Sequence, residues 1–168
     1  MHNNVVAAVC AAVSTRGWAA LCFNFRGVGG SQGAYSGGVG EQEDVRAALI
    51  YLASVPEVTP DRFAVVGYSF GAWVGLSATA DDARVLALVA ISPPLRMYDF
   101  GFLATCAKPK LLLYGNRDEF VDAAALQELL AVLPEPKEQV LFPGVDHFWV
   151  AREGLMAEAV GTFLSGTS

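Results

Sequence analysis

Residues 63–71 read FAVVGYSFG, an uncharged run that leads into the spacing Gly-x-Ser-x-Gly. This spacing is typical of a sharp turn between a strand and a helix, on which the central serine exposes its hydroxyl. We therefore expect a strand over residues 62–67, a helix over 70–80, and Ser69 as a candidate nucleophile between them. The same spacing also arises by chance in a glycine-rich turn that only packs a helix on a sheet, but the flanking strand and helix patterns favour the nucleophile.

Apolar runs of strand length alternate with helical patterns along the rest of the chain. Strands are expected over residues 18–25, 62–67, 85–91, 110–114 and 138–142, and helices over 5–14, 41–53, 70–80, 123–132 and 152–164. Continuously apolar strands separated by helices indicate a mainly parallel sheet covered on both faces, which is a three-layer α/β sandwich. The length of 168 residues, without a linker or repeat, indicates a single domain over residues 1–168.

Two further polar residues each follow an expected strand. Asp118 follows the strand at 110–114, and His147 follows the last strand. An imidazole can take a proton from a hydroxyl near neutral pH, and a carboxylate can orient that imidazole. Glu119, Asp122 and Asp146 compete with Asp118, but Asp146 adjoins His147, so their side chains should diverge, and Asp122 suits a helix cap. We prefer Asp118, and the alternative is that it only closes a turn.

Ser69, Asp118 and His147 occur in this order along the chain, and together they resemble the α/β-hydrolase superfamily. More narrowly, nearly the whole chain resembles the small, lidless predicted hydrolases of this superfamily. The stretches that carry the likeness are residues 23–29, 38–41, 67–71, 92–94, 99–100, 108–110, 118–120 and 144–148.

This resemblance implies a serine hydrolase that cleaves small carboxylic esters through an acyl-enzyme, with Ser69 as nucleophile, Asp118 as acid and His147 as base. We expect the backbone N–H of Phe70, at the start of a helix, to face the oxyanion, with Tyr68 beside it at the substrate. The substrate expected is a small ester, and neither a metal nor an organic cofactor is implied.

The chain departs from the family at its start. Family members begin with further strands and a His-Pro-rich loop that supplies a second oxyanion donor, whereas residues 1–6 resemble the helix after that loop. The absent third strand would lie between residues 18–25 and 62–67, so a gap with unpaired backbone groups is expected in an N-terminally shortened sheet. Direct pairing of these strands, a partner chain such as a homo-oligomer, or a fragmentary sequence could each account for it. The alternative function is therefore a catalytically weak or inactive binding protein of the same fold.

The glycine-rich residues 26–40 suggest a phosphate-binding loop, because a strand precedes them and a helix follows. The spacing Gly-x-Gly-x-x-Gly fails, however, since Gln32 and Glu43 stand where glycine is needed. We expect a shaped loop at the edge of the crevice instead, with Arg26 paired to an acid of the next helix. Residues 92–106 are too short for a multi-helix lid, and their aromatic side chains, Tyr98, Phe100 and Phe102, either line an acyl pocket or pack in the core.

Composition excludes other classes of partner. The net charge is −6 without a basic cluster, so a nucleic-acid partner is not expected. No Lys or Arg precedes the apolar residues 5–13, and the uncharged residues 63–80 begin as a strand, so we expect no membrane association and a cytoplasmic location. Cys10, Cys22 and Cys106 form no recognisable motif, and we expect free thiols, with Cys22 buried as a small hydrophobe.

Overall fold

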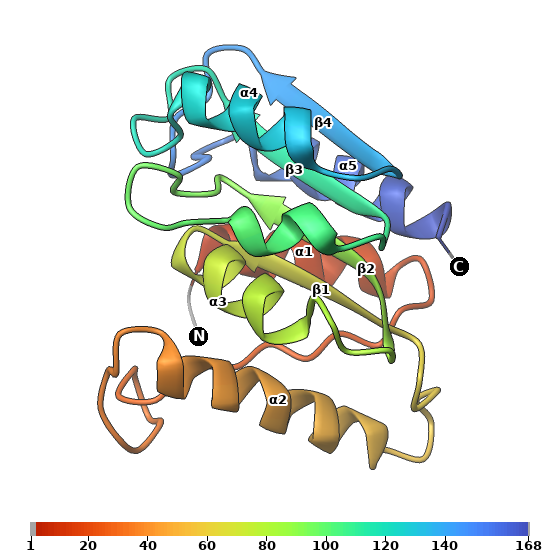
Figure 1. The fold of residues 1–168 in the computed structure, drawn as a ribbon. Helices are drawn as coiled ribbons and strands as arrows, with labels where there is room; N and C mark the ends of the chain where they lie inside the picture. The colour runs from red at the N-terminus through yellow and green to blue at the C-terminus, as the bar shows by residue number, and fades with distance from the viewer. Residues whose placement is uncertain (1–2, 168) are drawn as a thin grey trace.

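The computed structural model describes residues 3–167, which form a parallel sheet between two layers of helices (Figure 1). The sheet has four strands in the order β1-β2-β3-β4, and every neighbouring pair is parallel. The strands are β1 (Phe63–Tyr68), β2 (Val85–Ile91), β3 (Lys110–Gly115) and β4 (Lys137–Phe142). The helices are α1 (Asn4–Ser14), α2 (Val39–Ala53), α3 (Phe70–Thr79), α4 (Ala123–Val132) and α5 (Glu153–Ser165), with a 3-10 helix η1 (Gly101–Thr105). The predicted α/β sandwich with a parallel sheet is therefore confirmed.

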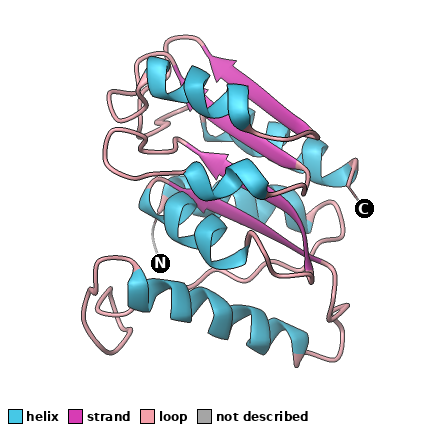
Figure 2. Ribbon diagram, in the orientation of Figure 1, coloured by secondary structure: helices cyan, strands magenta, loops and turns pink. Residues whose placement is uncertain are grey.

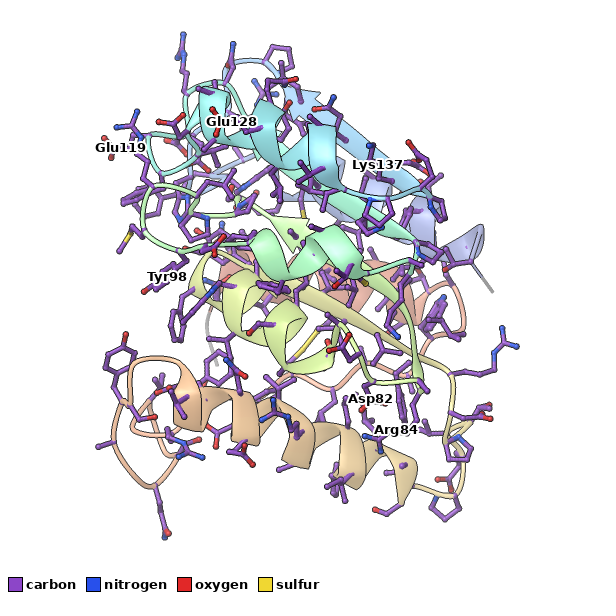
Figure 3. The ribbon with its side chains drawn as sticks, in the orientation of Figure 1. Asp82, Arg84, Tyr98, Glu119, Glu128 and Lys137 are labelled. Carbon is purple, nitrogen blue, oxygen red and sulfur yellow. A yellow bond between two sulfur atoms is a disulfide. The ribbon has the colours of Figure 1, made fainter. Side chains whose placement is uncertain are left out.

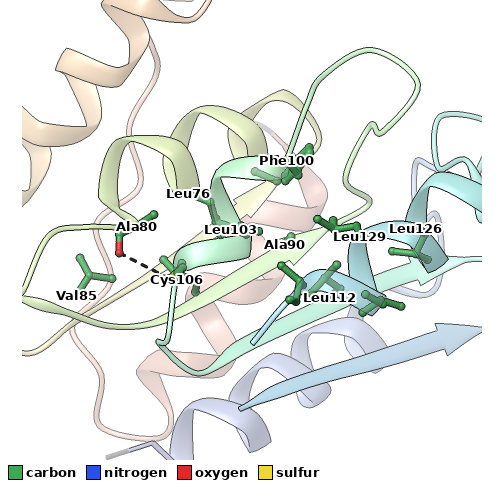
Figure 4. Close-up of a cluster of buried hydrophobic side chains, with 14 of the residues drawn as sticks. Leu76, Ala80, Val85, Ala90, Phe100, Leu103, Cys106, Leu112, Leu126 and Leu129 are labelled. Carbon is green, nitrogen blue, oxygen red and sulfur yellow. Dashed lines mark hydrogen bonds between the residues drawn. The ribbon is translucent and has the colours of Figure 1, made fainter. Parts of the chain in front are cut away.

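Successive residues of β1, β2 and β3 enter two separate cores. In β3, Leu112 belongs to the core that also contains residues of α2, α3, η1 and α4, whereas Leu111 and Leu113 belong to the core formed with α1 and α5. Figure 2 shows the strands enclosed by helices in this way, and Figure 4 shows the first of the two cores in detail. Because both faces are covered there, β1 and β2 are apolar throughout, whereas the edge strand β4 carries Lys137, Glu138 and Gln139.

Local signals fix where two of the helices begin. The side chain of Asn3 accepts a hydrogen bond from the N–H of Val6 and so caps α1. Asp122 accepts from the N–H groups of Ala124 and Ala125, and this confirms that it caps a helix. Each cap satisfies backbone donors that have no partner within the helix.

Residues 18–25 do not form the predicted strand. They form a loop without regular secondary structure, and the N–H of Trp18 bonds back to the carbonyl of Val13 at the end of α1. β1 pairs with β2 alone, so neither direct pairing nor a further strand closes the expected gap within the described residues. Apolar and β-branched composition favours a strand, but a strand also needs a neighbour with which to hydrogen-bond.

The prediction of three free thiols is wrong for two of them. Cys10 of α1 forms a disulfide with Cys22, which lies in the loop that follows the helix. Cys22 is exposed and not buried as predicted. Cys106 is free and buried, as expected, and its thiol lies 3.6 Å from the carbonyl oxygen of Ala80.

The helices of the structure can be compared with the length and polarity that crossing a membrane requires. Within residues 3–167, every helix is too short or too polar to span a bilayer. The uncharged residues 63–80 divide into β1 and α3, as predicted.

The central strand should be sensitive to loss of side-chain volume. Leu88 of β2 is fully buried, so Leu88→Ala should lower the free energy of unfolding by about 2–5 kcal/mol through a cavity in the core. Urea unfolding followed by circular dichroism measures this change. Leu141→Ala, at a half-exposed leucine of β4, is the matched control and should cost less than about 1 kcal/mol. Equal costs for the two variants would contradict the assignment of the core.

Candidate active site

The candidate residues lie at the edge of the sheet where the strands end. Ser69 follows β1 directly, Asp118 comes shortly after β3, and His147 follows β4. Parallel strands bring their carboxyl ends to one edge, where ligands bind in sheets of this kind. In Figure 3, Tyr98 and Glu119 lie at this edge, and Asp82 and Arg84 lie at the opposite one.

Ser69 occupies a strained turn between β1 and α3. Its φ of 53° and ψ of −125° lie in a region that side chains rarely adopt. The turn depends on Gly67, since a side chain there would overlap the backbone of Gly71 and Ala72. Gly71 is less constrained, because a side chain would meet only the ring of Phe25 at 3.9 Å. Of the two glycines in the motif, Gly67 is therefore the one that close packing requires.

Hydrogen bonds join the three predicted side chains in a row. His147 Nε2 lies 2.9 Å from Ser69 Oγ, and His147 Nδ1 lies 2.9 and 3.0 Å from the two oxygens of Asp118. Asp118 and His147 are both buried. The competing acids lie elsewhere: Asp146 accepts from the N–H of Phe148, and Glu119 is exposed. Asp118 is thus the carboxylate that contacts the imidazole.

Asp118 is a buried charge with several donors. Burial raises the pKa of its carboxyl, but hydrogen bonds from His147, from the Ser92 hydroxyl and from the N–H of Phe120 hold the pKa below its usual value. Sequence reasoning missed Ser92 and Trp149 as parts of this network. Trp149 Nε1 donates to Ser92 Oγ at 2.9 Å, and both residues are fully buried. Ser92 directly follows β2, and Trp149 lies two residues after His147. These positions were the signals by which the sequence could have revealed the two residues.

Tyr68 and Phe70 flank Ser69, and they contribute different groups to the site: a side-chain hydroxyl and a backbone N–H. The hydroxyl of Tyr68 donates to the carbonyl of His147 at 2.9 Å and so supports the histidine backbone. The contact of Tyr68 with the substrate stays a prediction. Burial, and then the charges of Asp118 and Asp146, raise the pKa of Tyr68 to about 12. The N–H of Phe70 begins α3 and has no acceptor within residues 3–167. This N–H is therefore free to bind an anion beside Ser69.

Aromatic rings collect next to the serine. The ring of Phe70 lies 5.8 Å from those of Phe25, Tyr35 and Tyr98, and Tyr98 stacks on Trp73 at 4.4 Å. Tyr98 and Phe102 pack against the first core and Phe100 is buried in it, so the packing alternative is confirmed for these residues. That these side chains line an acyl pocket stays a prediction.

The glycine-rich residues 26–40 form a loop that is fixed at both ends. Arg26 forms an ion pair of 2.7 Å with Asp44 of α2, as predicted. The buried carboxylate of Glu41 accepts from the N–H groups of Ser36 and Gly38. Gly38 has a φ of 97° and packs against Trp73, so the loop is held beside the aromatic cluster. In the part of the chain that the structure describes, no three His, Cys, Asp or Glu side chains are grouped to hold a metal ion.

Comparisons with known proteins agree with this fold. A serine hydrolase homologue from Coxiella burnetii is 33% identical with a TM-score of 0.88, over 98% of this chain and 77% of that one. An α/β serine hydrolase without a lid from Xanthomonas campestris is 31% identical with a TM-score of 0.87, over 99% of this chain and 74% of that one. An uncharacterised protein of Rickettsia prowazekii is 33% identical over 98% of this chain and 72% of its own length.

A family model also matches most of the chain. The match covers residues 38–160, and this range contains Ser69, Asp118 and His147. The family is a hydrolase family, and the sheet, the helical layers and the similar solved structures agree with it. The chain therefore belongs to the dienelactone hydrolase family and has the α/β-hydrolase fold.

Proposed function

We propose that the protein is a serine hydrolase that cleaves small carboxylic esters through an acyl-enzyme. The observation that carries this proposal is the continuous row of contacts from Ser69 through His147 to Asp118, with 2.9 Å between the serine oxygen and the imidazole. A nucleophile within hydrogen-bond reach of a base, which a third group orients, is the arrangement that activates a serine. The serine hydrolase relatives from Coxiella and Xanthomonas support the same chemistry.

The first half of the reaction acylates Ser69. Its Oγ attacks the acyl carbon as His147 Nε2 takes the hydroxyl proton, and the carbonyl electrons move onto oxygen to form an oxyanion near the N–H of Phe70. Asp118 keeps the Nδ1 proton of His147 in place and stabilises the imidazolium. The oxyanion then collapses, the ester C–O bond breaks, and His147 gives its proton to the leaving alkoxide.

The second half releases the acid and restores the serine. A water molecule loses a proton to His147 and attacks the acyl carbon, and the proton then passes to Ser69 Oγ as the acyl–serine bond breaks. The cluster around Phe70 and Tyr98 supports a substrate with an apolar acyl group, because these rings offer apolar surface beside the nucleophile.

Removal of the nucleophile should abolish turnover. For Ser69→Ala, we expect hydrolysis of p-nitrophenyl acetate and butyrate to fall by roughly a million-fold, to background, as measured by nitrophenolate release. Ser77→Ala is the matched control, because Ser77 lies on the same helix and bonds only to the Val74 carbonyl. If the wild-type protein shows no turnover, the alternative of a non-catalytic binding protein holds instead.

The carboxylate should matter through its contact with His147. Asp118→Asn should lower kcat for p-nitrophenyl acetate by about 10⁴-fold, because an amide does not stabilise the required imidazole tautomer or the imidazolium. Asp146→Asn serves as control, since Asp146 is adjacent in sequence but bonds to the N–H of Phe148. Similar losses in the two variants would argue against a specific role for Asp118.

Asp118 should also make stability depend on pH. Its pKa is lowered in the folded protein, so the ionised carboxylate stabilises the fold above the usual aspartate pKa of about 3.9, and this contribution is lost as the pH falls through the lowered value. Urea unfolding at pH 6, 4 and 3 should therefore show the wild type losing more stability than Asp118→Asn. Parallel losses in the two proteins would contradict the lowered pKa.

A further inference from the structure

Two buried residues next to the candidate site have a strained backbone. Ser92 has a φ of 49° and Trp149 a φ of 60°, and residues other than glycine rarely adopt this left-handed region. Both side chains are fully buried. Backbone strain of this kind persists only where the surrounding structure imposes it, and it is concentrated at functional sites.

These two residues contact each other although they are 57 positions apart in the chain. Trp149 Nε1 donates to Ser92 Oγ at 2.9 Å. The indole ring belongs to the core formed with α1 and α5, and it meets the ring of Phe142 at 5.0 Å. The N–H of Ser92 donates to the carbonyl of Leu113 at 2.7 Å, which ties Ser92 to β3. The surroundings therefore fix both the donor and the acceptor of this hydrogen bond.

The hydroxyl of Ser92 lies between a group that only donates and a group that only accepts. An indole N–H donates and never accepts, whereas an ionised carboxylate accepts and never donates. Trp149 donates to Ser92 Oγ, so the hydroxyl hydrogen remains for the hydrogen bond between Ser92 and Asp118. The direction of donation is thereby fixed from the indole to the hydroxyl and from the hydroxyl to the carboxylate.

This direction favours the ionised form of Asp118. Its carboxylate also accepts from the N–H of Phe120 at 3.0 Å and contacts His147 Nδ1 through both oxygens. Every donor stabilises the negative charge, so the loss of one donor favours the protonated form. An Asp118 that took up a proton would no longer stabilise an imidazolium at His147.

We propose that Ser92 and Trp149 are positioning residues, which hold Asp118 ionised and directed at His147 through this fixed chain of donors. Their effect on turnover rests on the proposed ester hydrolysis, whereas their effect on the charge of Asp118 does not. The alternative is a structural role, in which the hydrogen bond between them only satisfies two polar groups inside the protein.

Other charged or titratable groups lie near Asp118 in space or in sequence. All of them are retained in the variants described below, so a changed titration of Asp118 reports the loss of the donor chain. They are His147, Tyr68, Asp146, Arg117 and Glu119.

The first variant, Ser92→Ala, removes the donor to Asp118. We expect the pKa of Asp118 to rise, because the ionised carboxylate loses a hydrogen bond. For p-nitrophenyl acetate, kcat should fall by about tenfold to hundredfold with KM unchanged, because the interaction matters only when the imidazolium forms. The carboxyl ¹³C resonance of Asp118, assigned by its absence in Asp118→Asn, is followed against pH, and nitrophenolate release gives kcat and KM.

The second variant, Trp149→Phe, keeps the Ser92 hydroxyl and removes the indole N–H. The hydroxyl is then free to turn, so the pKa of Asp118 should also rise, and kcat should fall by about twofold to tenfold. Added to Ser92→Ala, Trp149→Phe should lower kcat no further, because the indole acts through the hydroxyl. Trp149→Phe also carries the test alone if Ser92→Ala, which leaves a buried indole N–H without its acceptor, fails to fold.

Thr79→Val is the matched control. It removes another buried hydroxyl, which donates to the carbonyl of Gly75 at the end of α3 away from Ser69. This variant should change neither the titration of Asp118 nor kcat.

The outcomes separate the two roles. Loss of stability in urea, with the wild-type kcat and the wild-type pKa of Asp118 in both Ser92→Ala and Trp149→Phe, establishes a structural role and overturns the proposal. Independent, multiplying losses of kcat from the two substitutions overturn it as well. If the wild-type protein does not hydrolyse the ester, the proposed function fails, but the titration of Asp118 still supports or overturns the donor chain.

Discussion

Parallel pairing of neighbouring strands is the constraint on which the candidate site depends. Each strand of the sheet runs in the same direction, so residues that are far apart in sequence emerge at one edge. Ser69, Asp118 and His147 are separated by tens of residues, yet the register of β1, β3 and β4 brings their side chains within hydrogen-bond distance. The two apolar cores hold this register, because a strand that shifted by one residue would exchange the faces of its side chains.

At this edge of the sheet, close packing maintains the strained backbone of Ser69, and hydrogen bonds stabilise the buried charge of Asp118. Ser69 keeps a positive φ because Gly67 allows α3 to pack closely against β1. The Asp118 carboxylate is buried, and the hydroxyl of Ser92, itself held by Trp149, is among its donors. A buried charge without such donors would cost several kcal/mol, so the network and the ionised form of Asp118 depend on each other.

Much of the fold could be predicted from the sequence, because the signals are local. Apolar runs and helical periods located the four strands and five α-helices of residues 3–167, and Ser69, Asp118 and His147 followed from their positions after strands. The failures concern contacts between distant segments. Residues 18–25 have strand composition but no neighbour to pair with, and the disulfide between Cys10 and Cys22 depends on how the chain returns beside α1. The hydroxyl of Tyr68 likewise turns to the His147 backbone, which no local pattern indicates.

The central claim is that the imidazole of His147 activates the hydroxyl of Ser69, and covalent labelling tests it most directly. The protein is incubated with a fluorophosphonate, which reacts with activated serines, and the modified peptide is identified by mass spectrometry. We expect labelling at Ser69 in the wild-type protein and loss of labelling in His147→Ala, with the fold retained by circular dichroism. A folded wild-type protein that is not labelled at Ser69, or a His147→Ala variant that is labelled at the same rate, would contradict the claim.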